Sequence, residues 1–204
     1  MTARLWSHTS WAALTRLFLV PLLLAIYAPS LSEAADEQSG AVELIETVRQ
    51  AAIVLGHGGP AEPQLRSISA AFDGRGIAQA VLGTHWRNAS ADDRAAVVDA
   101  LLYAIAHRLA DRLERTRDTN FAVLGTRALA NGDILVRSEF RRPLHRPTSV
   151  EWRVRHCRGK LCIGDVFIDG GSVTVQQRDR IAQMLAGNGG SIPALVVDLR
   201  KGRV

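Results

Sequence analysis

The sequence predicts an α+β fold in which helices pack on a curved antiparallel sheet of at least four strands. Three observations lead to this prediction. Apolar residues recur at helical spacing through residues 40–113. From Asn120 the period changes to two, over four short runs rich in β-branched residues. Two more helical runs close the chain, and helices and strands segregated in this way are typical of the α+β class.

The N-terminal residues 1–34 have the layout of a secretory signal peptide. A basic segment without acids precedes the 12-residue apolar run Leu17–Ala28, and Ser32-Glu33-Ala34 offers small residues for cleavage near Ala34 or Ala35. The alternative is a membrane anchor, but twelve apolar residues are too short to cross a hydrocarbon core of about 30 Å. We therefore expect an exported protein whose residues 35–204 form a single domain.

Four helical segments are predicted before the first strand. Gly40–Leu55 is followed by a Gly-rich linker, Glu62–Phe72 and Arg75–Gly83 are shorter, and the longest helix begins after Ser90. Ser90 is the expected N-cap of that helix, with Asp93 at the reciprocal position of a capping box. The apolar stripe of the long helix consists of Val97, Val98, Leu101, Leu102, Ile105, Leu109 and Leu113.

The second half of the chain is predicted to form a meander of strands followed by two helices. The connections between the strands are short, which favours antiparallel neighbours. Gly170-Gly171 ends the last strand, and Ser172 is the expected N-cap of the helix that follows. The strands are expected at Phe121–Leu129, Ile134–Phe140, Val150–His156 and Leu161–Ile168, and the helices at Ser172–Leu185 and Ile192–Lys201.

The two cysteines, Cys157 and Cys162, flank the last predicted hairpin. If residues 158–161 form a four-residue loop, the cysteines face each other across the strands and a disulfide is favoured. If the turn is only Arg158-Gly159, the thiols lie diagonally, which is harder to bridge. A structural disulfide is the preferred interpretation in an oxidising compartment. A zinc site needs more ligands than this pair and His156 offer, so no metal is expected.

The basic balance of the chain, with a formal net charge of +5, could indicate a nucleic-acid partner. The export signal argues against that partner, because an exported protein rarely meets nucleic acid. A basic segment is expected at the hairpin ends and on one sheet face, where it could meet anionic headgroups at a membrane surface or simply keep the protein soluble. It consists of Arg141, Arg142, His145, Arg146, Arg153, Arg155, Arg158 and Lys160.

A catalytic interpretation finds little support in the sequence. Six histidines are scattered without metal-ligand spacing, and no G-x-S-x-G motif is present. Asp165 alternates with apolar neighbours, so it could act as a base beside His85 or His156 in a small hydrolase. The interpretation we favour is a carboxylate satisfied by backbone groups or by an arginine. The hydrolase would require a histidine within hydrogen-bond reach of Asp165 in a polar pocket.

Two sets of motifs resemble the MlaC family of periplasmic phospholipid-shuttle proteins of Gram-negative bacteria, also called toluene-tolerance proteins. The first is D-V-x-I-D-G-x-S at 165–172, followed by Gln177-Arg178 and by G-G-x-I-x-x-L from Gly189. The second is F-D-G-R-G-I-A-Q-A-V-L-G-T-H-W-R at 72–87, followed by A-S-A-D-D-R at 89–94. The motifs stand in the family's order over residues 40–201, and the hopanoid-associated HpnM-like branch is a reasonable sub-assignment.

The resemblance implies an NTF2-like fold, a phospholipid cargo, and no catalytic step, cofactor or metal. It also implies two partners, namely an inner-membrane ABC transporter with an MCE-domain subunit and an outer-membrane lipoprotein complex. The chain departs from the family where aromatic residues are usual, because Val97, Leu101 and Leu109 stand at those positions. Smaller side chains leave room for a wider cavity, so a hopanoid or another polycyclic lipid is the alternative cargo.

A lipid carrier must enclose the tails of its cargo, because each CH₂ group exposed to water costs about 0.8 kcal/mol. The walls of such a cavity are mostly aliphatic. Each candidate side chain could equally belong to the packed core, and we expect about half of them to contact lipid. The candidates are Val97, Leu101, Ile105, Leu109, Ile134, Val136, Val150, Trp152, Val154, Val166 and Ile168.

Overall fold

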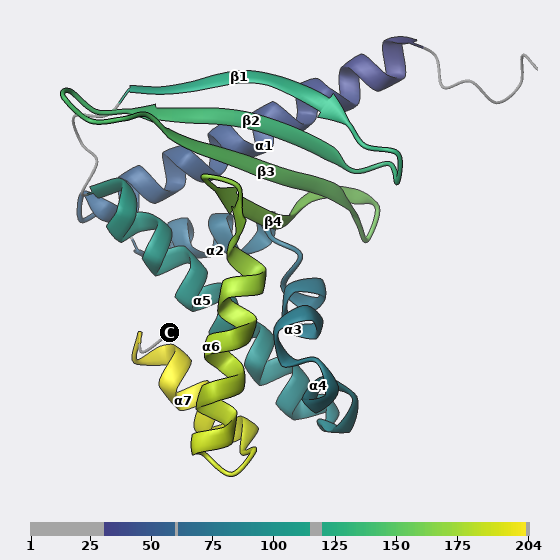
Figure 1. Ribbon diagram of the computed structural model, residues 1–204, viewed down its shortest axis with the longest axis vertical. Coiled ribbons are helices and arrows are strands. Elements are labelled where there is room, and N and C mark those ends of the chain that lie inside the picture. The colour runs from purple at the N-terminus through teal and green to yellow at the C-terminus, as the bar shows by residue number, and fades with distance from the viewer. Residues whose placement is uncertain (1–30, 60, 115–119, 203–204) are drawn as a thin grey trace, which may run out of the picture. The chain divides into compact units, whose positions relative to one another are not determined.

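The computed structural model describes residues 31–59, 61–114 and 120–202 (Figure 1). The chain divides into two compact units, residues 1–35 and 36–204, and the architecture below is that of the second unit. The predicted signal peptide, residues 1–34, lies outside the described residues except for its last four, so its cleavage stays a prediction. No helix in the described ranges is both long and apolar enough to span a membrane.

Helices precede and follow a single antiparallel sheet, which confirms the predicted α+β class. The helices α2, α3, α5, α6 and α7 pack on one another, and α2, α3 and α6 also contact β4. The helices are α1 (Leu31–Gly56), α2 (Ala61–Ala71), α3 (Gly74–Leu82), α4 (Thr84–Asn88), α5 (Ala91–Glu114), α6 (Val173–Gly187) and α7 (Ile192–Arg200). The strands are β1 (Asn120–Ala128), β2 (Ile134–Arg141), β3 (Thr148–Cys157), β4 (Lys160–Ile168) and β5 (Gly171–Ser172).

The strands follow one another in the sheet in their order along the chain. The short strand β5 goes beyond the four predicted, because the chain turns back on β4 at Asp169-Gly170. Both turn residues have positive φ angles, 48° and 83°, a conformation that glycine and aspartate adopt at low cost. The turn leads from β5 directly into α6, so the position of β4 determines where α6 begins (Figure 1).

The β3–β4 hairpin takes the shorter of the two predicted turns. Cys157 pairs with Lys160, and Arg158 and Gly159 have φ angles of 52° and 77°. The four-residue loop is therefore wrong. In this register the two cysteines lie diagonally across the strands rather than opposite each other. A disulfide nevertheless joins Cys157 to Cys162, and their Cα atoms are 6.0 Å apart, which is within the usual range for a disulfide. A bulge farther along β4 leaves Gly164 unpaired, between the pairs formed by Ile163 and Asp165.

Helix α1 lies across the sheet in its part from residue 36 onward. Gln38 accepts a hydrogen bond of 2.5 Å from Thr126 of β1, and the guanidinium of Arg49 lies 5.3 Å from the ring centre of Phe121. Glu37 pairs with His156 of β3 at 2.5 Å. The side chains of α1 that are fully buried in the shared core include Ala41, Ile45, Val48 and Ala52. This helix therefore helps to fill the sheet side of the core.

An ion pair at the end of the β1–β2 hairpin should make the stability of the protein depend on pH in the acidic range. The buried carboxylate of Asp133 accepts a 2.5 Å hydrogen bond from Arg153. Burial opposes ionisation, but the hydrogen bonds with Arg153 and Asn131 outweigh it and lower the pKa of Asp133. Because the folded-state pKa lies below the unfolded one, the stabilisation is present above about pH 4 and disappears as the pH falls through the folded-state pKa.

We therefore expect an Asp133→Asn variant to lose less stability than the wild type on acidification. The free energy of unfolding, measured with urea at a series of pH values from neutral down to about pH 2.5, should fall less steeply in the variant. The exposed Asp179 on α6 provides the control, and Asp179→Asn should keep the wild-type slope. If the free energy of unfolding fell equally steeply with pH in Asp133→Asn and in the wild type, the stabilising role of the ionised Asp133 would be contradicted.

Candidate functional site

An apolar cavity of about 70 Å³ lies between β4 and the helices α3, α5, α6 and α7. An apolar cavity of about 150 Å³ is known to accommodate benzene. In this conformation the space is therefore too small for an acyl chain, and a hydrocarbon ligand requires the surrounding elements to move apart. The apolar side chains in the wall are Phe72, Ile77, Val81, Leu101, Ala104, Ile105, Val166, Val173 and Leu199.

Three of the eleven predicted lining residues line this cavity, namely Leu101, Ile105 and Val166. Leu109 and Ile168 are partly buried outside its wall. The other six belong to the packed core, and they are Val97, Ile134, Val136, Val150, Trp152 and Val154. Helix α1 contributes to the same core, which explains why side chains of β2 and β3 meet other side chains rather than open space. Lipid contact by the predicted set stays a prediction.

The predicted set missed the contributions of α3 and α7 to the cavity. Ile77 and Val81 come from α3, Leu199 comes from α7, and Phe72 precedes α3. The apolar spacing of both helices was visible in the sequence and indicated which residues would be buried. It carried no information about which element those residues would face.

Asp165 is the acidic residue in the cavity wall, and its carboxylate accepts four hydrogen bonds. The donors to Oδ1 are the backbone N–H of Val166 at 2.8 Å and the N–H and hydroxyl of Thr174 at 3.1 and 2.7 Å. Ser172 Oγ donates to Oδ2 at 2.6 Å and itself accepts a 3.1 Å bond from Val175 N, as an N-cap does. The carboxylate therefore fastens the first turn of α6 to β4.

The hydrolase alternative lacks the contact that it requires. Among the described residues, the hydrogen-bond donors to Asp165 are backbone and hydroxyl groups, and His156 pairs instead with Glu37. His85 is exposed on α4. Within the residues that the structure describes, no three His, Cys, Asp or Glu side chains are grouped so as to hold a metal ion. Asp165 is better explained as a structural carboxylate, the interpretation that the sequence favoured.

Two polar side chains line the cavity without a partner in the described part of the chain. Gln177 of α6 has its Oε1 atom buried with no hydrogen bond. Arg108 of α5 has no hydrogen bond or ion pair among the described residues. Burial lowers the pKa of Arg108, and the nearby guanidinium of Arg180 lowers it further. The cavity thus combines an aliphatic wall with a cation that no carboxylate in the described ranges neutralises.

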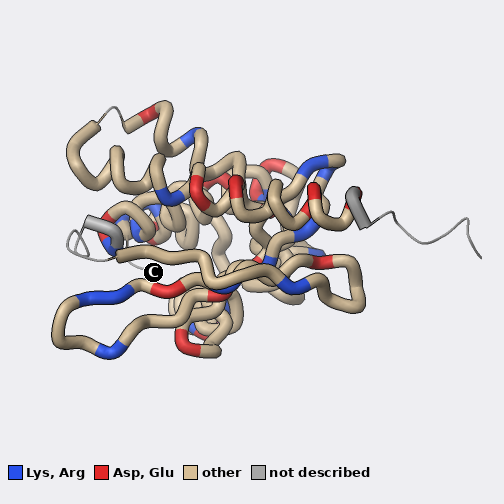
Figure 2. Tube along the Cα trace, turned by 90° about the horizontal axis from the view of Figure 1, so that it is seen from above, with Lys and Arg blue, Asp and Glu red and all other residues tan. Residues whose placement is uncertain are grey.

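The predicted basic segment lies mainly at the two ends of β3. Arg141, Arg142 and Arg146 are exposed around the β2–β3 connection. Arg158 and Lys160 are exposed at the β3–β4 turn, which antiparallel pairing places at the opposite end of β3. Figure 2 shows basic and acidic positions scattered over the rest of the described trace. The segment therefore forms two separate clusters rather than one continuous basic face.

Comparison with known proteins decides the family. Residues 65–201, from α2 to the end of α7, match the family described as MlaC protein. The chain belongs to the MlaC family. This confirms the resemblance drawn from the motifs, while the HpnM-like sub-assignment stays a prediction.

A solved structure shares the fold of this MlaC-family chain. It is that of the phospholipid-binding protein from Ralstonia solanacearum, determined in complex with a phospholipid. The TM-score is 0.66 at 20% sequence identity, and the alignment covers 81% of this chain and 96% of that chain. The search of curated proteins gave no match.

Proposed function

We propose that this MlaC-family protein encloses the acyl tails of a phospholipid and carries the lipid through the periplasm between the outer and inner membranes. The observation that carries the proposal is the apolar cavity between β4 and the helices. The cavity lies in a fold shared with a protein whose structure contains a phospholipid. In this proposal the signal peptide, residues 1–34, exports the lipid-binding domain, residues 35–204.

The family resemblance suggests the partners of such a shuttle. An outer-membrane lipoprotein complex would exchange lipid with the protein on one side. An inner-membrane ABC transporter with an MCE-domain subunit would do so on the other. A soluble carrier suits this role because it needs no chemistry of its own, only a hydrocarbon interior that releases the lipid to a membrane of similar polarity.

Binding requires the cavity to expand, because its volume of about 70 Å³ cannot hold a tail. Partial enclosure would not suffice, since every CH₂ group left in water costs about 0.8 kcal/mol. Helix α7 packs on α5 and α6 and contributes Leu199 to the wall. An outward movement of α7 would open the cavity while leaving every strand pair of the sheet intact. We infer that α7 moves when lipid enters.

The unneutralised Arg108 favours phospholipid over hopanoid. Arg108 is half-buried, and a partly desolvated cation that has no counter-ion among the described residues is unfavourable. A lipid phosphate near the cavity mouth would provide that counter-ion and would also offset the repulsion between Arg108 and Arg180. A hydrocarbon polycycle would leave both unfavourable contributions in place. Hopanoid is the second candidate because aliphatic Leu101 stands where the resemblance leads one to expect an aromatic residue.

An Arg108→Gln variant should bind anionic phospholipid about tenfold more weakly than the wild type, because it loses a charge-assisted interaction with the phosphate. The measurement is the transfer of phosphatidylglycerol from vesicles to the protein. Arg178→Gln, an exposed position on α6, removes the same charge outside the cavity and should leave transfer unchanged. Equal transfer by both variants would show that Arg108 does not hold the phosphate.

The cargo itself is identified by extracting the purified protein and analysing the extract by mass spectrometry. About one phospholipid per protein would support the proposal. A hopanoid at that ratio would establish the second candidate instead. A protein that is lipid-free after export in a lipid-replete cell would contradict both.

A further inference from the structure

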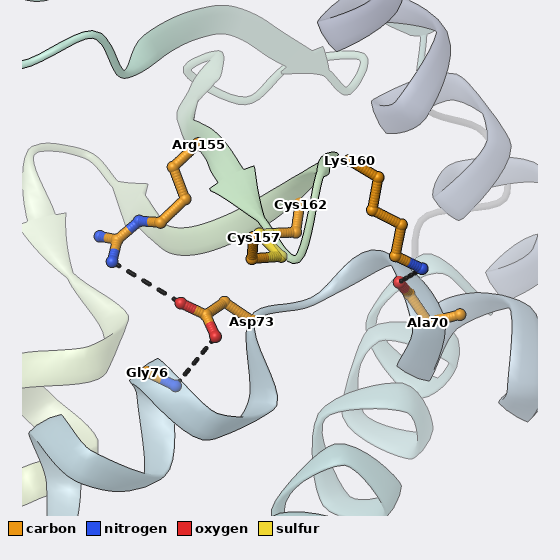
Figure 3. Close-up of a disulfide and its surroundings, with 7 residues drawn as sticks. All are labelled: Ala70, Asp73, Gly76, Arg155, Cys157, Lys160 and Cys162. Carbon is orange, nitrogen blue, oxygen red and sulfur yellow. Dashed lines mark hydrogen bonds and ion pairs between the residues drawn. A yellow bond between two sulfur atoms is a disulfide. The ribbon is translucent and has the colours of Figure 1, made fainter.

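A second pocket, of about 490 Å³, lies where the junction between α2 and α3 meets the end of the β3–β4 hairpin. Two segments far apart in the sequence supply cations to its wall. Arg75 comes from α3, and Arg155, Arg158 and Lys160 come from the hairpin. Figure 3 shows Arg155 and Lys160 reaching from the hairpin toward the α2–α3 segment, with the disulfide between them. The acidic residue in the wall is Asp73.

The positive charge of this pocket is largely uncompensated. Asp73 already accepts a 2.9 Å hydrogen bond from Gly76 N as the N-cap of α3, and its other oxygen lies 3.7 Å from Arg155 Nη1. Lys160 Nζ donates to the carbonyl of Ala70 at 3.2 Å and has no carboxylate partner in the described ranges. Arg158 likewise has no ion pair there. Within the wall, four cations therefore face the single carboxylate of Asp73, and Asp133, outside the wall, also attracts Arg155.

Arg155 is held in place by packing against the bulge in β4. A Cβ atom at Gly164 would lie 2.4 Å from Arg155 Nε, so the guanidinium occupies the space that a side chain would need. Nε itself is buried without a hydrogen-bond partner. The guanidinium extends toward Asp73 (Figure 3). A fixed guanidinium is pre-organised to bind an anion, because little side-chain entropy remains to be lost.

Two further features organise the pocket. The disulfide between Cys157 and Cys162 cross-links the end of the hairpin that carries Arg158 and Lys160. Helix α3 begins in the wall at Gly74, and the start of a helix favours negative charge. Cations from two elements thus converge on a space bounded by a cross-linked turn and a helix start.

We infer that this pocket binds a phosphate group. Phosphate offers several acceptor oxygens to guanidinium and ammonium donors, and its charge matches the excess of cations. The group could belong to the headgroup of an anionic lipid at a membrane surface or to free phosphate. Phe72 lines both this pocket and the apolar cavity, so the two sites share one wall. The site is nevertheless separate from the proposed cargo site, where Arg108 is the cation that has no ion pair within the described part of the chain.

The test compares two double variants that each remove two exposed cations. Arg158→Gln with Lys160→Gln alters the pocket. Arg142→Gln with Arg146→Gln alters the β2–β3 connection, outside the pocket, and is the matched control. Each protein is titrated with inorganic phosphate and followed by backbone amide NMR shifts. Each is also sedimented with vesicles of phosphatidylglycerol and, for reference, of phosphatidylcholine.

If free phosphate is the ligand, the wild type and the control should bind inorganic phosphate saturably, and the pocket variant at least about tenfold more weakly. If a lipid headgroup is the ligand, the same pattern should appear with phosphatidylglycerol vesicles and not with phosphatidylcholine. Absence of saturable phosphate binding, together with equal vesicle binding by both double variants, would overturn the inference. Such a result would mean that the cations attract anions only non-specifically and do not form a defined phosphate site.

Measuring co-purified lipid in the same preparations separates this inference from the proposed function. Neither Arg158 nor Lys160 lines the apolar cavity, so the pocket variant should keep the wild-type amount of lipid. Loss of lipid from the pocket variant alone would overturn the separation of the two sites. A lipid-free wild type would contradict the cargo proposal, while the phosphate titration would still decide the present one.

Discussion

Replacing Leu101 by aspartate is expected to abolish lipid co-purification while the protein still folds and is exported. Leu101 lies in the cavity wall and is only 5% exposed. An ionised carboxylate in contact with hydrocarbon carries a desolvation cost of several kcal/mol. This cost would weaken the binding of lipid tails beside it. Without lipid, the carboxylate borders a cavity of about 70 Å³, which offers room for water. The charge therefore penalises the loaded state more than the empty one.

The measurement is the molar ratio of extracted lipid to purified protein. Leu101→Ala is the matched control, because it removes the same packing without adding a charge. It should lower the free energy of unfolding by about 2–5 kcal/mol yet keep the lipid. A folded Leu101→Asp protein that carries lipid at the wild-type ratio would show that this cavity is not the cargo site.

Val136 shows why the position of the charge matters. The sequence alone places Val136 in the same predicted lining as Leu101. In the structure Val136 is fully buried in the core and outside the cavity wall. Val136→Glu is therefore expected to prevent folding rather than to remove lipid from a folded protein.

Replacing Asp165 by alanine is expected to lower the free energy of unfolding by about 3 kcal/mol, because the carboxylate makes four hydrogen bonds. These bonds connect β4 to the first turn of α6, at Ser172 and Thr174. A charge-assisted hydrogen bond contributes about 1.5–3 kcal/mol, but the donors left behind are only partly buried and can bind water. The total is therefore well below the sum of the four.

Urea unfolding of Asp165→Ala and of Asp179→Ala provides the measurement and its control. Asp179 is exposed on the same helix, so its replacement should change the free energy of unfolding by less than about 0.5 kcal/mol. If Asp165→Ala were as stable as this control, the carboxylate would have no role in fastening α6. The question of a catalytic role would then reopen.

Local features of the fold could be predicted because they depend on residues within a few positions of one another. Ser90 accepts a 3.0 Å hydrogen bond from Asp93 N, as the capping box predicted, and Ser172 caps α6. The choice between two turns at Arg158-Gly159 stayed open, since both satisfy the local sequence. Strand β5 was missed because it exists only through pairing with Phe167 and Ile168 of β4.

The candidate site was predicted less well, for a physical reason. Alternation of apolar residues shows which side chains are buried, but not whether another side chain or open space lies opposite them. Val97 and Leu101 belong to the same stripe of α5, yet only Leu101 lines the cavity. Arg108 stands on the same helix, and nothing in its neighbours indicates that its side chain borders an apolar space.

By itself, the sequence determined the α+β class, the order of helices and strands, and membership of the MlaC family. It could do so because periodicity, caps and motifs depend on residues that are close to one another in the chain. Only the tertiary structure decided which buried residues face a cavity. It also decided that Asp165 would anchor α6, and that Arg75 would meet the cations of the β3–β4 hairpin. These arrangements join segments far apart in the chain, and their contacts form only when the helices close against the sheet.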